Sequence, residues 1–403
     1  MSGRQVAKLL IEDPEGGTQV PFLRGILTRS LQNSGLPFED AYQLATTVRQ
    51  ELDDADSITL DELRSKVLSH LEKTSTASIA YRYQNQGTAD TNIQVKRVDG
   101  RLTPFSADQH RHCLETIGLT YKEAMMVTEE IRKHLIENQM MTVTSQEISR
   151  LTYHFLEKTE ILGPAVAKRW LVWIDFLRSG RPLILLIGGT SGCGKSTIAT
   201  ALANQLDIVR TQSTDMLREV MRSMLSKRLL PILHASSFSA WQALPSHEGR
   251  SLEDHDELLL AEGFLAQADL LSVASEAVIE RALRERVSLI FEGVHIHPSL
   301  LDRIPTDTDA VIAPIMLAVL KRSQLKERIA GRGTKVPQRR SARYLENFQD
   351  IWHLQSFLLS EADRTKIPII LNTKRDVVIR EIMRTVIETL SKDFTATPEE
   401  VFG

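Results

Sequence analysis

One segment of the sequence has the composition and spacing of a phosphate-binding loop: Gly189, Thr190, Ser191, Gly192, Cys193, Gly194, Lys195 and Ser196. Its glycines let backbone N–H groups turn inward on phosphate oxygens, and the start of a following helix adds partial positive charge. In such a loop Lys195 bridges the β- and γ-phosphates, and the hydroxyl of Ser196 ligates Mg²⁺. Thr197 is expected to add a phosphate contact. The predicted cofactors are therefore ATP and Mg²⁺.

Two carboxylates follow apolar stretches that would place them beside this loop. Asp215 comes after a predicted strand, 206–211, and before a predicted helix, 216–225. There it would accept the proton of an attacking hydroxyl, and a role as helix N-cap is the alternative. Glu292 lies in a third apolar strand, 287–295, and is expected to contact Mg²⁺ through water or to contact the substrate. The pattern indicates transfer of a phosphoryl group to a hydroxyl.

Basic residues supply candidates for binding the acceptor. Arg218 and Arg222 are one helical turn apart and would hold an anionic substrate, with Arg218 also acting in catalysis. Segment 321–343 contains nine basic residues against one acid, Glu327, and its glycines suit a lid that closes on phosphates. The cations expected to touch phosphates are Arg328, Arg332, Arg339 and Arg340, with Arg332 assigned to catalysis. A nucleic-acid patch is the rival interpretation, but this segment lacks interleaved aromatic residues that stack bases.

The apolar runs that carry these residues alternate with helical patterns. This alternation predicts a P-loop α/β domain over residues 160–395, with a parallel sheet and helices on both faces. The strand ends beside the phosphate loop would then face one crevice.

The first 160 residues contain an internal repeat. Pro-Phe at 21–22 recurs at 104–105, and Leu-Glu-Lys-Thr at 71–74 recurs at 156–159. Each copy begins with a short β-like piece and continues with three amphipathic helical patterns. Two small, mainly helical domains are therefore expected, at 5–75 and 91–159, joined by a polar linker.

Composition limits the remaining possibilities. A net charge of −3 favours neither nucleic acid nor an anionic membrane as a partner, and no apolar run has the length of a membrane span. The two cysteines, Cys113 and Cys193, suit a reducing cytoplasm. Cys193 occupies a variable loop position, where we expect a tolerated residue with an exposed thiol that can sense oxidation. The sequence predicts a soluble, cytoplasmic protein and leaves a homo-oligomer open.

Residues 160 to 390 resemble the archaeal-type 2-phosphoglycerate kinases and their bacterial and plant relatives. The segments that carry the resemblance are IGGTSGCGKSTIA, STDMLREVMR, LLPILHASSFSAWQAL, EAVIERAL, FEGVHIHP and the helix containing Tyr344 and Phe348. The resemblance implies transfer of the ATP γ-phosphoryl group to 2-phosphoglycerate, giving 2,3-bisphosphoglycerate. It also places His234 and Ser236 in the acceptor pocket, although a loop anchored in the core is the alternative. A kinase of another phosphorylated small molecule, such as an inositol phosphate, and a non-catalytic nucleotide sensor are the other readings.

Both N-terminal copies resemble the ATP-cone, a nucleotide-binding regulatory module. The second copy is the better match, because Lys96 and Arg97 stand in the opening hairpin where cations would meet phosphates. The first copy has Glu12 and Asp13 at this place, which would repel phosphate. The resemblance implies that the second module binds adenine nucleotide and biases lid closure or oligomerisation.

Overall fold

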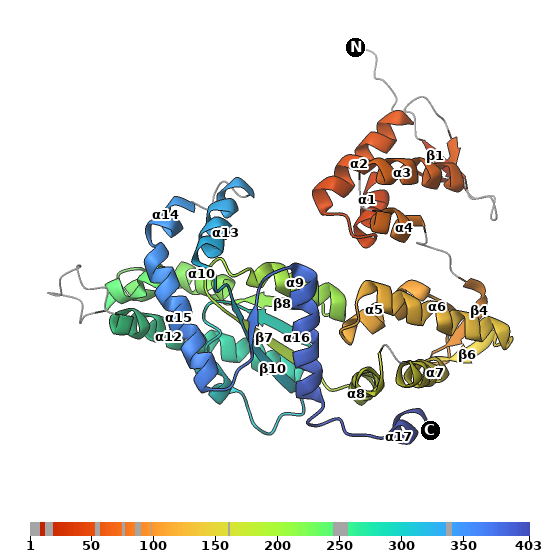
Figure 1. Cartoon of the computed structure of the whole chain (residues 1–403). Helices are drawn as coiled ribbons and strands as arrows, with labels where there is room; N and C mark the ends of the chain where they lie inside the picture. Colours follow the sequence, from red (N-terminus) through yellow and green to blue (C-terminus); the bar gives the residue numbers. More distant parts are fainter. Residues whose placement is uncertain are drawn as a thin grey trace, which may run out of the picture. The chain divides into compact units, whose positions relative to one another are not determined.

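The structure is a computed structural model that describes residues 9–12, 19–52, 57–74, 77–84, 90–97, 99–159, 162–244, 257–335 and 341–403. The chain divides into two compact units (Figure 1). The first consists of residues 1–94 and 104–108, and the second of residues 95–103 and 109–403. Most of the second N-terminal copy therefore belongs to the same unit as the phosphate loop.

The second unit contains a five-stranded parallel sheet in the order β11-β10-β7-β9-β8. Its strands are β7 (Leu183–Gly188), β8 (Arg210–Ser213), β9 (Leu289–Glu292), β10 (Val311–Ala318) and β11 (Ile369–Leu371). The chain leaves central β7 to build β8 and β9 on one side and then β10 and β11 on the other. The topological switch point, where such folds bind ligands, thus lies at the end of β7. The predicted P-loop α/β fold class is confirmed.

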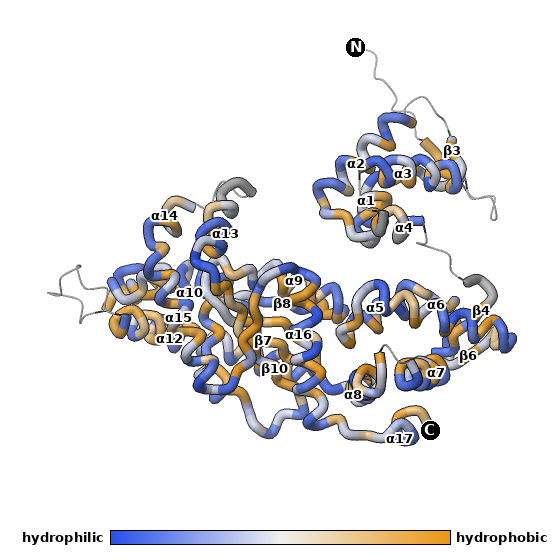
Figure 2. The backbone as a smooth tube through the Cα atoms, viewed as in Figure 1, coloured by the Kyte–Doolittle hydropathy of each residue, from blue (hydrophilic) through white to orange (hydrophobic). Residues whose placement is uncertain are grey.

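Helices cover both faces of this sheet. On one face lie α9 (Lys195–Leu206) and α16 (Arg375–Leu390), and on the other lie α12 (Glu257–Arg284) and α15 (Phe348–Arg364) (Figure 1). Figure 2 shows the apolar strands β7 and β10 between these layers. Among the helices described, α12 alone is long and apolar enough to cross a membrane, and 56% of its most apolar window is buried inside the protein. Such burial is what a core helix of a globular domain requires.

The second strand of the sheet begins later than predicted. The sequence suggested a strand over 206–211, but α9 continues to Leu206 and Asp207 then adopts a left-handed conformation with φ of 52°. Only after this helix end does the chain extend into β8. Further elements of the unit are α8 (Pro164–Ser179), α10 (Thr214–Met224), α11 (Pro231–His234), η1 (Ser237–Ala243), η3 (Pro298–Arg303), α13 (Arg322–Lys335), α14 (Ser341–Glu346) and α17 (Pro398–Phe402).

The two N-terminal copies have the same order of elements. The first has β1 (Leu10–Glu12), β2 (Gln19–Pro21), α1 (Arg24–Asn33), α2 (Phe38–Glu51), β3 (Ser57–Thr59) and α3 (Leu60–Thr74). The second has β4 (Asp90–Lys96), β5 (Leu102–Phe105), α5 (Ala107–Thr116), α6 (Tyr121–Glu137), β6 (Thr142–Thr144) and α7 (Ser145–Lys158). Each forms a three-stranded sheet with its first strand in the centre. The sequence had predicted the hairpins and the helices but not the third strands.

A capping box accounts for part of the sequence repeat. The Thr144 hydroxyl accepts a hydrogen bond from the Glu147 backbone N–H, and the Glu147 carboxylate accepts one from the Thr144 backbone N–H. Thr59 and Glu62 form the same pair in the first copy. These bonds satisfy backbone groups that the start of a helix leaves without intrahelical partners.

The segment between the copies is not a simple linker. Residues Ala77–Gln84 form helix α4, and Tyr83 is 6% exposed within the core of the first unit. The polar linker predicted over 75–91 is therefore helical over these eight residues. Ala80 and Tyr83, one helical turn apart, give the helix a buried face.

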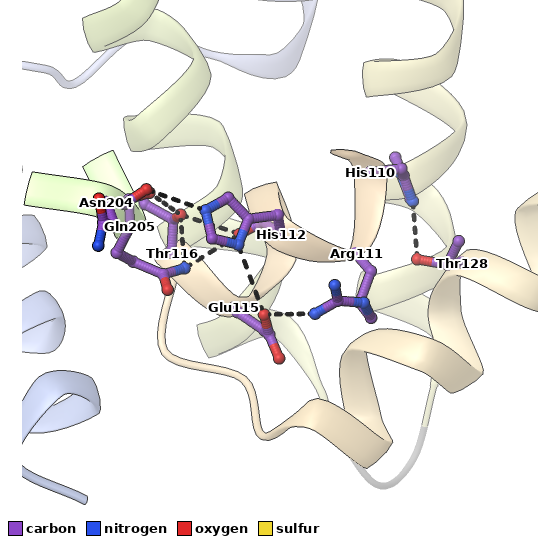
Figure 3. Close-up of polar contacts among 8 residues, drawn as sticks. All are labelled: His110, Arg111, His112, Glu115, Thr116, Thr128, Asn204 and Gln205. Atoms are coloured by element: carbon purple, nitrogen blue, oxygen red, sulfur yellow. Dashed lines mark hydrogen bonds and ion pairs between the residues drawn. The ribbon is translucent and has the colours of Figure 1, made fainter. Parts of the chain in front are cut away.

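Within the second unit, helix α5 contacts the last turn of α9 (Figure 3). His112 Nε2 lies 3.3 Å from the Asn204 carbonyl oxygen, and the Thr116 hydroxyl lies 3.4 Å from the carbonyl of Gln205. The Gln205 side chain donates in return to the His112 carbonyl at 3.3 Å. The second module is thus attached to the helix that begins at the phosphate loop.

Candidate phosphoryl-transfer site

The phosphate loop joins β7 to α9 in a conformation that requires glycine. Gly189, Gly192 and Gly194 have φ values of 137°, 91° and 92°. A Cβ atom on Gly189 would lie 2.5 Å from the Leu317 carbonyl oxygen, and one on Gly194 would collide with the Asn372 side chain. Because Gly194 has no side chain to cap α9, the first-turn N–H groups of the helix suit phosphate oxygens. The loop therefore fits the phosphates of ATP.

The loop's own side chains are mostly buried. Lys195 is 7% exposed and donates from Nζ to the Thr190 carbonyl at 3.0 Å, so the ammonium lies over the loop. Thr190 is buried, Ser191 is half-buried, and Thr197 is exposed on the first turn of α9. Cys193 is fully buried, and the prediction of an exposed, oxidation-sensing thiol is wrong. Its sulfur packs where Gly189 leaves room, and a Cβ on that glycine would lie 2.8 Å from it.

The predicted metal-binding residues meet at the strand ends. The Ser196 hydroxyl donates a hydrogen bond of 2.8 Å to Glu292 Oε1, and Glu292 is 8% exposed. The structure therefore brings together two residues that lie far apart in sequence. In the described part of the chain no cluster of three or more His, Cys, Asp or Glu side chains is arranged to hold a metal. Two oxygens suit Mg²⁺, which keeps several waters and takes phosphate oxygens as its other ligands.

Asp215 lies in the first turn of α10 and is exposed. The N-cap of this helix is Ser213, whose hydroxyl accepts a 3.2 Å hydrogen bond from the Asp215 backbone N–H. The alternative that made Asp215 the N-cap is therefore wrong. Ser213 is paired in register with Glu292 in the β8–β9 ladder. Asp215 therefore lies two residues beyond the end of the strand that neighbours Glu292, the predicted metal-binding carboxylate.

The two arginines of α10 have incompletely satisfied guanidinium groups. Arg218 Nη1 donates to the Ala235 carbonyl, and Arg222 Nη1 donates to Glu219 Oε2 at 2.7 Å. The Nε atoms of both arginines are buried without a hydrogen-bond partner among the described residues. Burial lowers the pKa of Arg218, and the nearby Asp215 carboxylate counteracts this effect. Buried donors without partners are costly, and an anionic ligand would satisfy them.

The pKa of His295 is affected by three charged residues of the predicted site. Burial lowers its pKa to about 3; Asp215 opposes this lowering, while Arg218 and Lys195 add to it. Asp215, Arg218 and Lys195 therefore lie within electrostatic range of one buried ring. The predicted base, anion-binding arginine and phosphate-loop lysine share one region.

The segment after α10 holds the two predicted acceptor residues. His234 Nε2 lies 2.8 Å from the Leu225 carbonyl oxygen, which ties α11 to the end of α10. Ser236 is half-buried and precedes η1, in which Phe238 is 1% exposed. This geometry agrees with a loop anchored in the core, and the acceptor role of both residues stays a prediction.

The predicted lid consists of α13, α14 and the residues between them. Arg328 Nη2 donates to the Asn372 carbonyl at 2.8 Å, and its Nη1 would lie 3.9 Å from a Cβ on Gly194, so this cation reaches the phosphate loop. Arg332 belongs to α13, but its side chain is outside the described part, as are Arg339 and Arg340 altogether.

Lys96 and Arg97 belong to a separate hairpin, formed by β4 and β5 of the second module. Both side chains are exposed, and Arg97 Nε donates to the Thr103 hydroxyl at 3.3 Å. Gly100, with φ of 82°, makes the turn between the two strands. The hairpin presents cations as predicted, and nucleotide binding there stays a prediction.

Two further residues hold the site together, and only Gln267 was not anticipated from the sequence. Asn372, at the end of β11, donates from its amide to the Cys193 carbonyl at 2.6 Å and so fixes the phosphate loop. Gln267 lies in the apolar helix α12 with a fully buried side chain. The only signal for Gln267 in the sequence is a polar residue at a buried position of an apolar helix.

No family model matches the chain, whereas individual proteins do. The 2-phosphoglycerate kinase of Pyrococcus furiosus is 33% identical over 297 residues, which cover 73% of this chain and 94% of that protein. The 2-phosphoglycerate kinase of Methanococcus maripaludis (strain C5) is 32% identical over 307 residues, covering 75% and 96%. A solved gluconokinase from Sinorhizobium meliloti covers 53% of this chain and 94% of its own at 19% identity, with a TM-score of 0.26. A score this low adds nothing to the fold assignment, which rests on strand order and the phosphate loop.

Proposed function

Because the chain belongs to the 2-phosphoglycerate kinase family, we propose that it transfers the γ-phosphoryl group of ATP to the 3-hydroxyl of 2-phosphoglycerate. The products would be 2,3-bisphosphoglycerate and ADP. The observation that carries this proposal is the meeting of Ser196 and Glu292 beside the phosphate loop, with unsatisfied arginine donors on the neighbouring helix.

On the donor side, Lys195 would leave the Thr190 carbonyl and neutralise the β- and γ-phosphates. Ser196 and Glu292 would hold Mg²⁺, and Arg328, with Arg332 from the same helix, would close over the transferred group. Bound ATP supplies the phosphoryl group and ADP as the leaving group. Closure of the lid matters because water competes with the acceptor for the phosphoryl group.

On the acceptor side, Arg218 and Arg222 would bind the phosphate that 2-phosphoglycerate already carries. A phosphate oxygen accepts hydrogen bonds in the planar geometry that guanidinium donors offer. Asp215 would accept the proton of the 3-hydroxyl as its oxygen bonds to phosphorus. His234, Ser236, Arg339 and Arg340 are further candidates for contacting this substrate.

The test is ADP release by the purified chain with Mg-ATP, in the presence and absence of 2-phosphoglycerate. We expect strong stimulation by 2-phosphoglycerate and loss of turnover in Lys195→Ala. The isomer 3-phosphoglycerate is the matched control, since its hydroxyl and phosphate are exchanged, and phosphorus NMR identifies the product. Equal ADP release with and without 2-phosphoglycerate would overturn this acceptor, and a panel of inositol phosphates and other phosphorylated hydroxy acids would then find its replacement.

A second proposal concerns the second N-terminal module. We propose that its hairpin binds adenine nucleotide through Lys96 and Arg97. Two exposed cations on a turn suit phosphates, and the attachment of the module to the last turn of α9 gives bound nucleotide a route to the phosphate loop. Such coupling arises when nucleotide at the hairpin and ATP at the phosphate loop both bind more tightly to the same conformation of the protein.

A further inference from the structure

A buried polar network lies behind the acceptor side of the site, and no part of the proposed chemistry uses it. Its members are Thr214, Gln267 and His295, whose side chains are 0%, 0% and 4% exposed. They come from α10, from α12 and from the loop after β9. Polar groups so deeply buried persist only when their hydrogen bonds are satisfied.

Gln267 is at the centre of the network. Its amide Nε2 lies 2.5 Å from the Ile232 carbonyl oxygen and 3.2 Å from that of Ala235. Its two hydrogens therefore bind residues 231–243, the segment that carries the predicted acceptor residues and is called the acceptor loop below. Its Oε1 must then accept, and it lies 2.8 Å from His295 Nε2. The two carbonyls therefore fix which way the amide faces.

The orientation of this amide in turn fixes the tautomer of His295. With Nε2 donating to Gln267, a neutral ring has its lone pair on Nδ1, which lies 3.4 Å from the Thr214 hydroxyl. The ring stacks on Phe264 with 5.8 Å between centroids and an interplanar angle of 7°, which holds its plane. The chain of hydrogen bonds thus ends at Thr214, which immediately precedes the predicted base, Asp215.

The same network contacts the anion-binding side chain. Arg218 donates to the Ala235 carbonyl that also accepts from Gln267. Gly293 leaves space for the network, since a Cβ there would overlap the Thr214 hydroxyl. One amide thus connects the acceptor loop, the arginine and the start of α10.

We propose that Gln267 is a positioning residue for the acceptor: through His295 and Thr214 it sets Asp215, and through the Ala235 carbonyl it sets Arg218. It touches neither ATP nor the reacting atoms. This inference rests on the proposed acceptor chemistry and adds to it the residue that aligns the two acceptor-binding groups with each other.

The first experiment uses Gln267→Met in the full chain, a change that keeps length and packing but removes every hydrogen bond of the amide. We expect the KM for 2-phosphoglycerate to rise about tenfold or more, because misplacing one hydrogen-bonded group costs roughly that factor. The KM for ATP should stay within about twofold of the wild type, since the phosphate loop is held separately by Asn372. Ser275→Ala is the control, because the hydroxyl of this buried serine of the same helix, within the described part of the chain, donates just to the Leu271 carbonyl one turn away.

Thr214→Val supplies a second variant that changes the far end of the network with little change in volume. We expect the same selective rise in acceptor KM, and a double variant whose effect is smaller than the product of the two single effects. Equal increases in both KM values, or independent effects of the two substitutions, would overturn the proposal.

Hydrogen exchange separates this inference from the proposed function. If the wild type does not turn over 2-phosphoglycerate, the function proposal fails, and backbone exchange still reports on positioning. Gln267→Met should then lose protection in residues 231–243 and retain it in residues 183–206, whereas Ser275→Ala should match the wild type in both. Unchanged protection in 231–243 would show that Gln267 does not hold the acceptor loop.

Discussion

The contact between Ser196 and Glu292 combines a hydrogen bond and a negative charge at the place where Mg²⁺ would bind. Glu292→Gln keeps the hydrogen bond and removes the negative charge, because the amide oxygen still accepts from the Ser196 hydroxyl but the amide is neutral. We expect kcat to fall about 100-fold, as when one electrostatic contact to a transferring phosphoryl group is removed. Titration of turnover with Mg²⁺ should also show a higher concentration for half-maximal rate.

Asp269→Asn is the control for this variant, since it removes a carboxylate from the exposed pair with Arg303 in the same domain. It should leave both kcat and the Mg²⁺ dependence as in the wild type. If Glu292→Gln behaved like the control, the carboxylate charge would have no part in holding the metal.

Individual residues also show where sequence reasoning ends. The loop glycines, Lys195 and Ser196 could be assigned in advance because the conformation that cradles phosphate requires their types in a fixed order. The burial of Cys193 could not, because it depends on packing against Gly189 and on strand β10, which is more than a hundred residues away. Gln267 was missed for the same reason: its partners lie in two segments, at α11 and after β9, that only the fold brings beside α12.

At the scale of elements, His110 joins three helices of the second module. Its Nδ1 lies 3.0 Å from the Thr128 hydroxyl of α6 (Figure 3). Its Nε2 lies 2.9 Å from the Thr152 hydroxyl of α7. Burial lowers the pKa of His110 from 6.5 to about 4, so the folded module holds the neutral ring. Between these two values the unfolded chain binds a proton that the folded chain does not.

Stability should therefore fall as the pH drops from 6.5 toward 4, by up to about 1.4 kcal/mol per pH unit from this group. His110→Gln removes this titration, so the difference in unfolding temperature between wild type and variant should narrow from pH 7 to pH 5. Thermal unfolding monitored by circular dichroism measures this difference in unfolding temperature. The control is His154→Gln, which replaces an exposed histidine of the same module. A difference that widened at low pH would mean that the folded state stabilises the charged ring.

Elements were predicted with uneven success, and the errors have physical causes. Helices and strands with a clear period were found, and the shared Thr-x-x-Glu pattern of the two copies is a helix start in both. The strands β3 and β6 were not predicted, because three residues are too few to show an alternation of apolar and polar side chains. Their extended conformation depends on pairing with a neighbouring strand, as β3 pairs with β1. The linker prediction did not include helix α4, because the polar residues and the glycine around it outweigh its few apolar side chains.

For the whole molecule, the question is how many nucleotides one chain binds. If the second module binds adenine nucleotide, calorimetry on the full chain should find two ATP sites. Lys195→Ala should leave one of them, and combining it with Lys96→Glu and Arg97→Glu should leave none. These charge reversals lie on exposed side chains, so the unfolding temperature should change little.

A Lys73→Glu variant in the first module, combined with Lys195→Ala, controls for the loss of positive charge as such. Binding of a single ATP by the wild type, removed by Lys195→Ala alone, would mean that the second module is not a nucleotide site.

The attachment between α5 and α9 has a consequence for how such chains diverge. His112 and Thr116 bond to backbone carbonyls of residues 204 and 205, and every amino acid at those positions offers the same carbonyls. Only the Gln205 amide depends on residue type on the α9 side. The α9 side can therefore vary in sequence without losing the attachment. The α8 side cannot, because Arg169 and Trp170 donate from their side chains to the Ile117 and Ser149 carbonyls of the module.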